Sequence, residues 1–150
     1  MGPVLASVLA GRNCSALVFR GNDGLDELTT TAPSAVWIVH DGEVSGTTMD
    51  PADLGIPRSQ PADLKGGDPA HNAAVVRAFV AGEQGPVRDT ALLNAAAALA
   101  AEAGVASPEA LVPALAEGYR RAVAAIDSGA AADLLDRWIA TSQRLSATGS

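Results

Sequence analysis

A run of five residues, Ser15-Ala16-Leu17-Val18-Phe19, constrains the fold of this chain more than any other feature. The run is short and mostly apolar, and it lies between Asn13 and a glycine-rich segment that starts at Gly21. This length and these flanks predict a buried β-strand. Such a strand needs cover on both faces and a neighbour along each edge, because otherwise its apolar side chains and unpaired backbone groups face water.

Two further extended runs follow over residues 35–40 and 43–49, with Asp41-Gly42 between them. An Asp-Gly pair between two such runs is a strong signal of a β-hairpin, since both residues accept the positive φ of a tight turn. We therefore expect three strands. Three strands form a small sheet with open edges, so we expect the chain to be part of a larger unit.

Helices are expected on both sides of the strands in the sequence. Val4, Leu5, Val8 and Leu9 form an apolar stripe that predicts a helix over 1–13. The 32 alanines are concentrated after Ala70, where Pro marks the start and Gly the end of the first three helical patterns. These signals predict four more helices, from Asp68-Pro69 to Gly82, from Gly85-Pro86 to Gly104, from Ser107-Pro108 to Gly129, and around 134–139.

Smaller features complete the prediction of an α/β fold. Asp50-Pro51 predicts a single helical turn inside the irregular segment 50–67. Tyr119 and Trp138 fall at helical spacing and are predicted to lie in the core. The small polar residues 146–150 predict a disordered tail after a domain that spans 1–145.

Composition excludes several classes of protein. The net charge of −7 argues against binding to nucleic acid or to an anionic membrane, because a protein gains from counterion release only through positive charge. The one cysteine, Cys14, excludes a disulfide framework. No window of about 18 residues is apolar and free of charge, so no transmembrane helix is expected. The N-terminus lacks the basic region of a secretory signal, which favours the cytoplasm.

The richest local chemistry lies in Gly21-Asn22-Asp23-Gly24-Leu25-Asp26-Glu27, directly after the first strand. In open α/β sheets, ligands bind beyond the carboxyl ends of strands. Asp26 and Glu27 would repel each other unless a cation lay between them, and Mg²⁺ takes one or two carboxylates together with water and substrate phosphates. The pair therefore predicts a Mg²⁺–phosphate site. The alternative is a solvated pair at a helix N-terminus, where the helix dipole favours acidic residues.

Other polar residues have structural interpretations. Thr29-Thr30-Thr31 could offer hydroxyl groups to the acidic segment, but β-branched residues that lead into a strand are the favoured interpretation. Arg88, Asp89 and Asn94 interrupt an apolar helix and predict a hydrogen-bond network. His40 and His71 have no spacing typical of metal ligands.

These segments resemble anthranilate phosphoribosyltransferase. Residues 17–30 are similar to that family's segment V-H-G-x-D-G-L-D-E, and the resemblance runs in order from about Gly2 to Leu145. The later segments that carry it are Gly66-Gly67-Asp68, Asn72-Ala73, Gly85-Pro86-Val87-Arg88-Asp89, Leu92-Leu93-Asn94-Ala95-Ala96-Ala97 and Ala125-Ile126-Asp127-Ser128-Gly129-Ala130-Ala131.

The resemblance implies a reaction and a fold. Members join anthranilate to phosphoribosyl pyrophosphate in tryptophan biosynthesis, release pyrophosphate, and usually work as homodimers with Mg²⁺. Asp26 and Glu27 match the metal-binding pair of the family. The implied fold is a partial three-layer α/β/α domain of the nucleoside phosphorylase/phosphoribosyltransferase type, with a small mixed sheet followed by C-terminal helices.

Two departures limit what is expected of the chain. Arg20 stands where the family has His in the strand-end motif. The family's glycine-rich phosphate loop and its anthranilate-binding arginine belong to upstream segments that this sequence does not contain, so the resemblance covers a C-terminal portion and the isolated chain is expected to be inactive. Two other functions stay open: a non-catalytic α/β interaction module and a related nucleoside phosphorylase.

Overall fold

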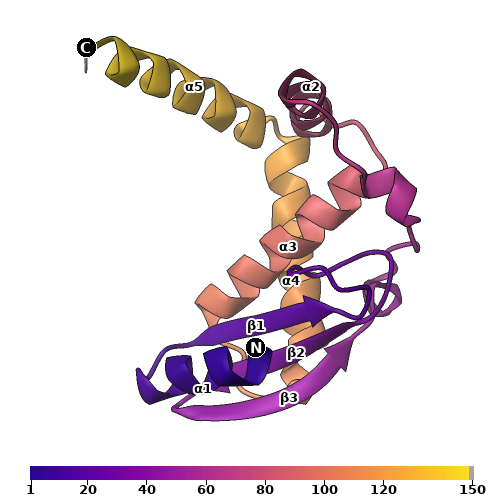
Figure 1. The fold of residues 1–150 in the computed structure, drawn as a ribbon, viewed down its shortest axis with the longest axis vertical. Helices are drawn as coiled ribbons and strands as arrows, with labels where there is room; N and C mark the ends of the chain where they lie inside the picture. Colours follow the sequence, from indigo (N-terminus) through magenta and orange to yellow (C-terminus); the bar gives the residue numbers. More distant parts are fainter. Residues whose placement is uncertain (149–150) are drawn as a thin grey trace.

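The computed structural model describes residues 1–148 of the 150-residue chain, and it has the predicted order of helix, three strands and four further helices (Figure 1). The predicted turn after Asp50 is present, and the Asp50 side chain accepts a hydrogen bond from the Ala52 N–H at 2.9 Å. The elements are α1 (Gly2–Gly11), β1 (Ala16–Gly21), β2 (Ser34–His40), β3 (Glu43–Met49), the 3₁₀ turns η1 (Pro51–Leu54) and η2 (Pro61–Leu64), α2 (Pro69–Val80), α3 (Pro86–Ala103), α4 (Pro108–Asp127) and α5 (Ala130–Thr148).

The sheet has the order β1-β2-β3, and both pairs of strands are antiparallel. The expected mixed sheet is therefore wrong for the described residues. The reason lies in the connections: a parallel neighbour needs a long crossover, whereas Asp41 and Gly42 close a two-residue hairpin with φ of 50° and 77°. Both positive values are those of the tight turn that Asp-Gly predicts.

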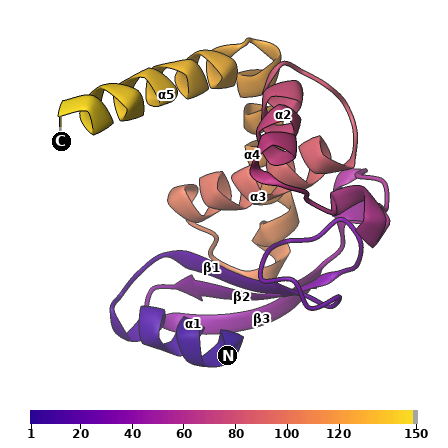
Figure 2. The same cartoon turned by 45° about the horizontal axis from the view of Figure 1, so that its top comes forward.

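Helices cover both faces of the sheet, as Figure 2 shows. Val18 and Val39 pack with α1 on one face. Leu17, Val36 and Ile38 alternate with them and face the larger core formed with α3 and α4. This arrangement confirms the three-layer α/β/α prediction and gives the first strand cover on both sides.

The contact between α1 and the sheet runs through small residues. Ala6 and Ala10 are buried, whereas the predicted stripe is exposed, with Val4 at 65% and Val8 at 54%. A Cβ added to Gly2 would lie 2.3 Å from the ring of Trp37. The helix therefore approaches the sheet too closely for large side chains, which explains why only Leu9 of the apolar stripe packs against the sheet cluster while the rest of the stripe is exposed.

The pair α3 and α4 also packs at close range. Gly118 of α4 lies against Ala96 of α3, and an added Cβ would stand 2.5 Å from the Ala96 carbonyl oxygen. Leu93 and Leu115 lie in the same core and are fully buried. The alanine-rich sequence of α3 thus serves close helix packing against α4 and the sheet.

The helix α5 extends away from the sheet and contacts mainly α4 (Figures 1 and 2). Trp138 is 70% exposed, so its predicted place in the core is wrong, and Leu134 beside it is 57% exposed. Tyr119 of α4 is half-buried. The disordered tail predicted over 146–150 is also wrong in part, because helical hydrogen bonding continues through Thr148; residues 149 and 150 lie outside the described part.

Within residues 1–148, no single helix combines the length and the apolar character that crossing a membrane requires. The consecutive helices α3 and α4 meet these criteria only when taken together, and the chain bends by 119° between them.

Candidate functional site

The acidic segment lies at one end of the sheet, where β1 ends. Gly21, the last residue of β1, pairs with Ser34 at the start of β2, so the intervening segment forms a loop beyond this end of the sheet (Figure 1). The Asp41-Gly42 hairpin closes the opposite end. Asp26 and Glu27 are both exposed on the loop. The structure therefore places the predicted pair beyond the carboxyl end of the strand, in irregular backbone rather than at a helix N-terminus.

Backbone hydrogen bonds fold the start of this loop back on the strand. The Gly21 N–H donates to the Leu25 carbonyl oxygen at 2.8 Å, and the Gly24 N–H donates to the Gly21 carbonyl oxygen at 3.0 Å. Gly24 has φ of 101°, which favours glycine because a Cβ crowds the backbone there. A Cβ on Gly21 would lie 2.3 Å from an Asp23 carboxylate oxygen, so a larger residue there would displace the Asp23 side chain from this turn.

Asp23 binds two hydroxyl groups of the same loop. Its Oδ2 accepts hydrogen bonds from Thr31 Oγ1 and, at 2.7 Å, from Thr29 Oγ1, while its Oδ1 accepts from the Leu25 N–H at 3.1 Å. Desolvation raises the pKa of Asp23, but the hydrogen bonds from Thr31, Thr29 and the Leu25 N–H together lower it further, to below the ordinary 3.8. Asp23 is thus an ionised structural member of the loop.

The loop is also attached to α3. Asn94 Oδ1 accepts from the Leu28 N–H at 3.0 Å, and Asn94 Nδ2 donates to the Leu28 carbonyl oxygen at 2.8 Å. Thr30 Oγ1 lies 2.8 Å from Thr90 Oγ1 and donates to Ser59 Oγ at 3.0 Å. Leu28 and Thr30 are fully buried. These contacts hold the end of the acidic loop on the first half of α3.

The threonine run therefore does not lead directly into a strand, because β2 begins only at Ser34. Thr29 and Thr31 offer hydroxyl groups to the acidic segment, which is the other interpretation, and Thr30 faces α3. From the sequence, no role was assigned to Asp23. Its signal is the pairing of a short carboxylate with hydroxyl residues a few positions later, a pattern of local hydrogen bonding in loops.

The three polar residues predicted on α3 make separate contacts, two to α4 and one to the acidic loop, which confirms their structural role. Arg88 is 4% exposed, and its Nη2 donates to Asp127 Oδ1 of α4 at 2.6 Å. Asp89 accepts a hydrogen bond from the Tyr119 hydroxyl. Burial raises the pKa of Asp89 more than the Tyr119 hydrogen bond and the Arg88 charge lower it. Asn94 belongs to neither contact and serves the acidic loop.

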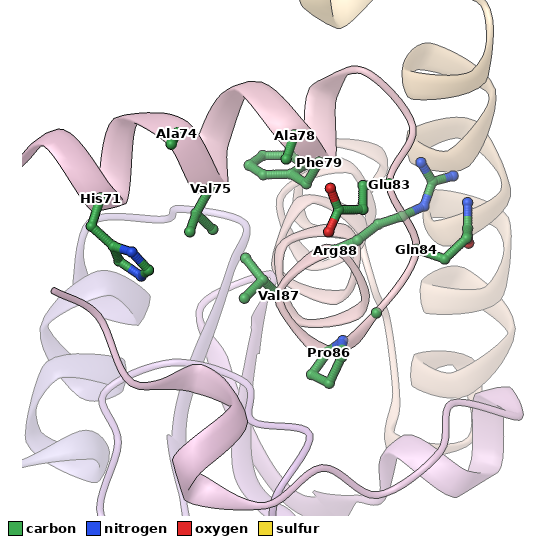
Figure 3. Close-up of a pocket in the computed structure, with 11 residues that line it drawn as sticks. His71, Ala74, Val75, Ala78, Phe79, Glu83, Gln84, Pro86, Val87 and Arg88 are labelled. Atoms are coloured by element: carbon green, nitrogen blue, oxygen red, sulfur yellow. The ribbon is translucent and has the colours of Figure 1, made fainter.

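A cavity of about 370 Å³ lies between α2 and the start of α3 (Figure 3). Phe79 and Val75 of α2 face Val87 of α3 across it, and the Arg88 side chain runs along one side, near Glu83. Its walls are mostly apolar, and neither Asp26 nor Glu27 lines it. The cavity and the acidic pair are therefore separate features of the structure.

The acidic pair fits a hard divalent cation that is shared with a ligand. Asp26 and Glu27 are consecutive, and both are exposed. Among residues 1–148, no group of three or more His, Cys, Asp and Glu side chains could hold a metal ion by itself. Two carboxylates suit Mg²⁺, which completes its shell with water and phosphate oxygens.

The chain is similar to known proteins over most of its length. Residues 1–132 match the family described as "Glycosyl transferase family, a/b domain". The chain is 57% identical over 143 residues to an anthranilate phosphoribosyltransferase from Thermobifida fusca (strain YX), with 95% of this chain and 40% of that protein covered. A second one, from Nocardioides sp. (strain ATCC BAA-499 / JS614), is 57% identical over 146 residues, with 96% and 42% covered.

Solved structures agree with the fold. The crystal structure of anthranilate phosphoribosyltransferase from Thermus thermophilus superposes with a TM-score of 0.78 at 31% identity and covers 93% of this chain and 39% of that chain. The Saccharomyces cerevisiae enzyme in complex with PRPP and Mg has a TM-score of 0.68 at 21% identity, with 81% and 33% covered, and shows a like fold.

The chain spans about 40% of the length of the curated relatives it matches. The resemblance predicted from the acidic segment and the later motifs is confirmed along nearly the whole chain. The chain therefore belongs to the glycosyl transferase family through its a/b domain, as a partial relative of the anthranilate phosphoribosyltransferases.

Proposed function

We propose that this chain is the C-terminal part, over residues 1–145, of an anthranilate phosphoribosyltransferase catalytic domain. In this function Asp26 and Glu27 bind Mg²⁺ together with the diphosphate of phosphoribosyl pyrophosphate. The observation that carries the proposal is their position: an exposed acidic pair at the end of β1, on a loop held by buried contacts, in a chain 57% identical to such enzymes.

The chemistry of phosphoribosyl transfer explains the need for this pair. Displacement at the anomeric carbon of ribose passes through an oxocarbenium-like state, and the pyrophosphate leaves with increased negative charge. Bound Mg²⁺ supplies positive charge to that leaving group. Asp26 and Glu27 hold the ion, and the hydrogen-bonded loop keeps both carboxylates at the end of the sheet.

Arg20 lies next to this region, as the penultimate residue of β1, and its side chain is exposed. A guanidinium group can donate hydrogen bonds to phosphate oxygens in a fixed planar arrangement. We infer that Arg20 replaces the hydrogen bonding of the family's His with a positive charge suited to the same polyanion.

The complete reaction needs more than this chain contains. The relatives are more than twice as long, and the segments that resemble the family here do not include its phosphate loop or its anthranilate site. We infer that catalysis and anthranilate binding require those parts, whereas the Mg²⁺–diphosphate contact is made by this chain, and that the complete protein is a homodimer. A cytoplasmic location, expected from the sequence, stays a prediction.

Calorimetric titration tests the metal site directly. Mg²⁺ and phosphoribosyl pyrophosphate are titrated into the chain and into the double variant Asp26→Asn/Glu27→Gln. We expect heat of binding with the native chain and none with the variant, because the neutral side chains no longer attract the ion. Absence of heat with the native chain, or the same heat with both, contradicts the proposal.

A matched variant controls for the change in net charge. Asp41→Asn/Glu43→Gln removes two exposed carboxylates at the opposite end of the sheet, so it alters net charge by the same amount. Its heat of binding is expected to equal that of the native chain. A similar loss of heat in this control would mean that overall charge, and not the acidic pair, governs binding.

A second candidate is a non-catalytic assembly module. The observation that favours it is the exposure of large apolar side chains at both ends of the chain, such as Val4 on α1 and Trp138 on α5. A chain that gives no heat with Mg²⁺ and phosphoribosyl pyrophosphate but binds another polypeptide through these helices would have this function.

A further inference from the structure

Asn94 is the one polar residue between Ala91 and Ala101 on α3. A polar side chain in an apolar helical surface costs free energy of desolvation unless its hydrogen-bonding groups find partners. Both amide hydrogens of Asn94 are used, one on the Leu28 carbonyl oxygen at 2.8 Å and one on the Thr90 carbonyl oxygen at 3.0 Å. Its oxygen accepts from the Leu28 N–H at 3.0 Å.

The contact between Asn94 and Leu28 matters because Leu28 directly follows the acidic pair in the chain. The Leu28 N–H belongs to the peptide group that joins Glu27 to Leu28, so Asn94 orients the peptide attached to the Cα of Glu27. Leu28 itself is 1% exposed in the core beneath the loop. The carboxylate of Glu27 thus projects from a backbone that is fixed on one side by two hydrogen bonds to a helix.

The other side of the acidic pair is fixed as well. Asp23, with its hydrogen bonds from Thr29, Thr31 and Leu25, holds the turn that precedes Asp26. The exposed pair therefore lies between two anchored points. Of these, only the Asn94 contact comes from a different element, and it spans 66 positions of the sequence.

We propose that Asn94 is a positioning residue for the metal-binding pair Asp26 and Glu27. The inference rests on the proposed function of that pair. Removing a residue that holds a metal ligand in place through hydrogen bonds typically lowers the metal affinity about 10–100-fold. The released ligand is more mobile, so it loses more conformational freedom when the metal binds. Asn94 acts in this way through the main chain, without touching the ion.

Paramagnetic NMR tests the proposal on the 150-residue chain. Mn²⁺ takes the same oxygen ligands as Mg²⁺ and broadens the amide signals of nearby residues, so its affinity is read from the signals of residues 24–28. In Asn94→Leu we expect about 10–100-fold weaker Mn²⁺ binding. The heteronuclear NOE of the same amides should fall, because the loop end is released. Asn94→Asp keeps the acceptor for Leu28 and loses the donor, and its affinity should be intermediate.

The control is Leu92→Ala on the same helix. Leu92 is 3% exposed and packs against Ala122 and Ile126 of α4, away from the loop. This variant should lower thermal stability but keep native Mn²⁺ affinity and native loop order. Equal loss of affinity in Leu92→Ala would overturn the proposal, as would native affinity and native loop order in Asn94→Leu.

Failure of the proposed metal site can be distinguished from failure of the proposed role of Asn94. If Mn²⁺ does not broaden residues 24–28 in the native chain, or still does so in Asp26→Asn/Glu27→Gln, the proposed function of the pair is wrong. The heteronuclear NOE of Asn94→Leu then still decides whether Asn94 holds the loop.

Discussion

Three carboxylates fall within five positions of the acidic segment, yet the structure gives them different roles. Asp23 accepts hydrogen bonds from two hydroxyl groups and a main-chain N–H, which lower its pKa. Asp26 and Glu27 are exposed and face solvent. The same residue type builds the loop at one position and is available to a ligand at the next, according to which donors lie within reach.

The hydroxyl groups around Asp23 predict a measurable pH dependence. Because its pKa is lower in the folded chain than the ordinary 3.8, the ionised carboxylate stabilises the fold above pH 3.8, and this contribution is lost as the pH falls through the lowered value. In Thr29→Val/Thr31→Val the donors are removed while the shape is kept. We expect the titration midpoint of the Asp23 carboxyl carbon, followed by NMR, to rise. An unchanged midpoint would show that these hydroxyl groups do not lower the pKa.

Packing between elements depends on small residues at defined contacts. The helices α3 and α4 meet where Gly118 lies on Ala96, and α1 meets the sheet through Ala6 and Ala10. Sequence patterns predicted these elements well, since caps and periodicity are local. They did not predict which face of α1 is buried, because the close approach to Trp37 selects small side chains over the apolar stripe.

Gly118→Ala separates helix propensity from packing. Alanine is about 1 kcal/mol better than glycine inside a helix, so propensity alone predicts a stabilised chain. The added Cβ would stand 2.5 Å from the Ala96 carbonyl oxygen, so we expect the free energy of unfolding to fall by about 1–3 kcal/mol in urea denaturation.

The control is Gly11→Ala at the end of α1, where an added Cβ meets nothing within 4 Å. There the free energy of unfolding should stay equal or increase slightly. Stabilisation by Gly118→Ala would show that α3 and α4 can move apart at no cost.

The whole molecule has a well-packed centre and sparsely packed ends. The sheet, α1, α3 and α4 enclose the main core, whereas α5 extends from α4 with Leu134 and Trp138 largely exposed. The outer edge of β1 has no strand neighbour among residues 1–148. Leu134 and Trp138 are one helical turn apart, so they expose adjacent apolar surface of the kind found at interaction sites. The chain spans about 40% of the length of its relatives.

We therefore expect the isolated chain to self-associate as its concentration rises and to bind a dye that reports apolar surface. Leu134→Ser/Trp138→Gln should reduce both effects, because it removes two exposed apolar side chains of α5. Light scattering and dye fluorescence measure them. The control Asp136→Asn/Arg137→Gln changes exposed residues of the same helix at constant net charge and should behave as the native chain. A monomeric native chain that binds no dye would contradict this expectation.

The amino-acid sequence by itself determined the strands, the Asp41-Gly42 hairpin, the helix boundaries at Pro and Gly, and the resemblance carried by the acidic segment. All of these depend on local periodicity, turn chemistry and motif spacing. Only the tertiary structure decided that β1 pairs antiparallel with β2, that Asn94 holds Leu28 and that Trp138 is exposed. Such features arise from contacts between residues far apart in the chain, and their geometry depends on how closely the backbones approach.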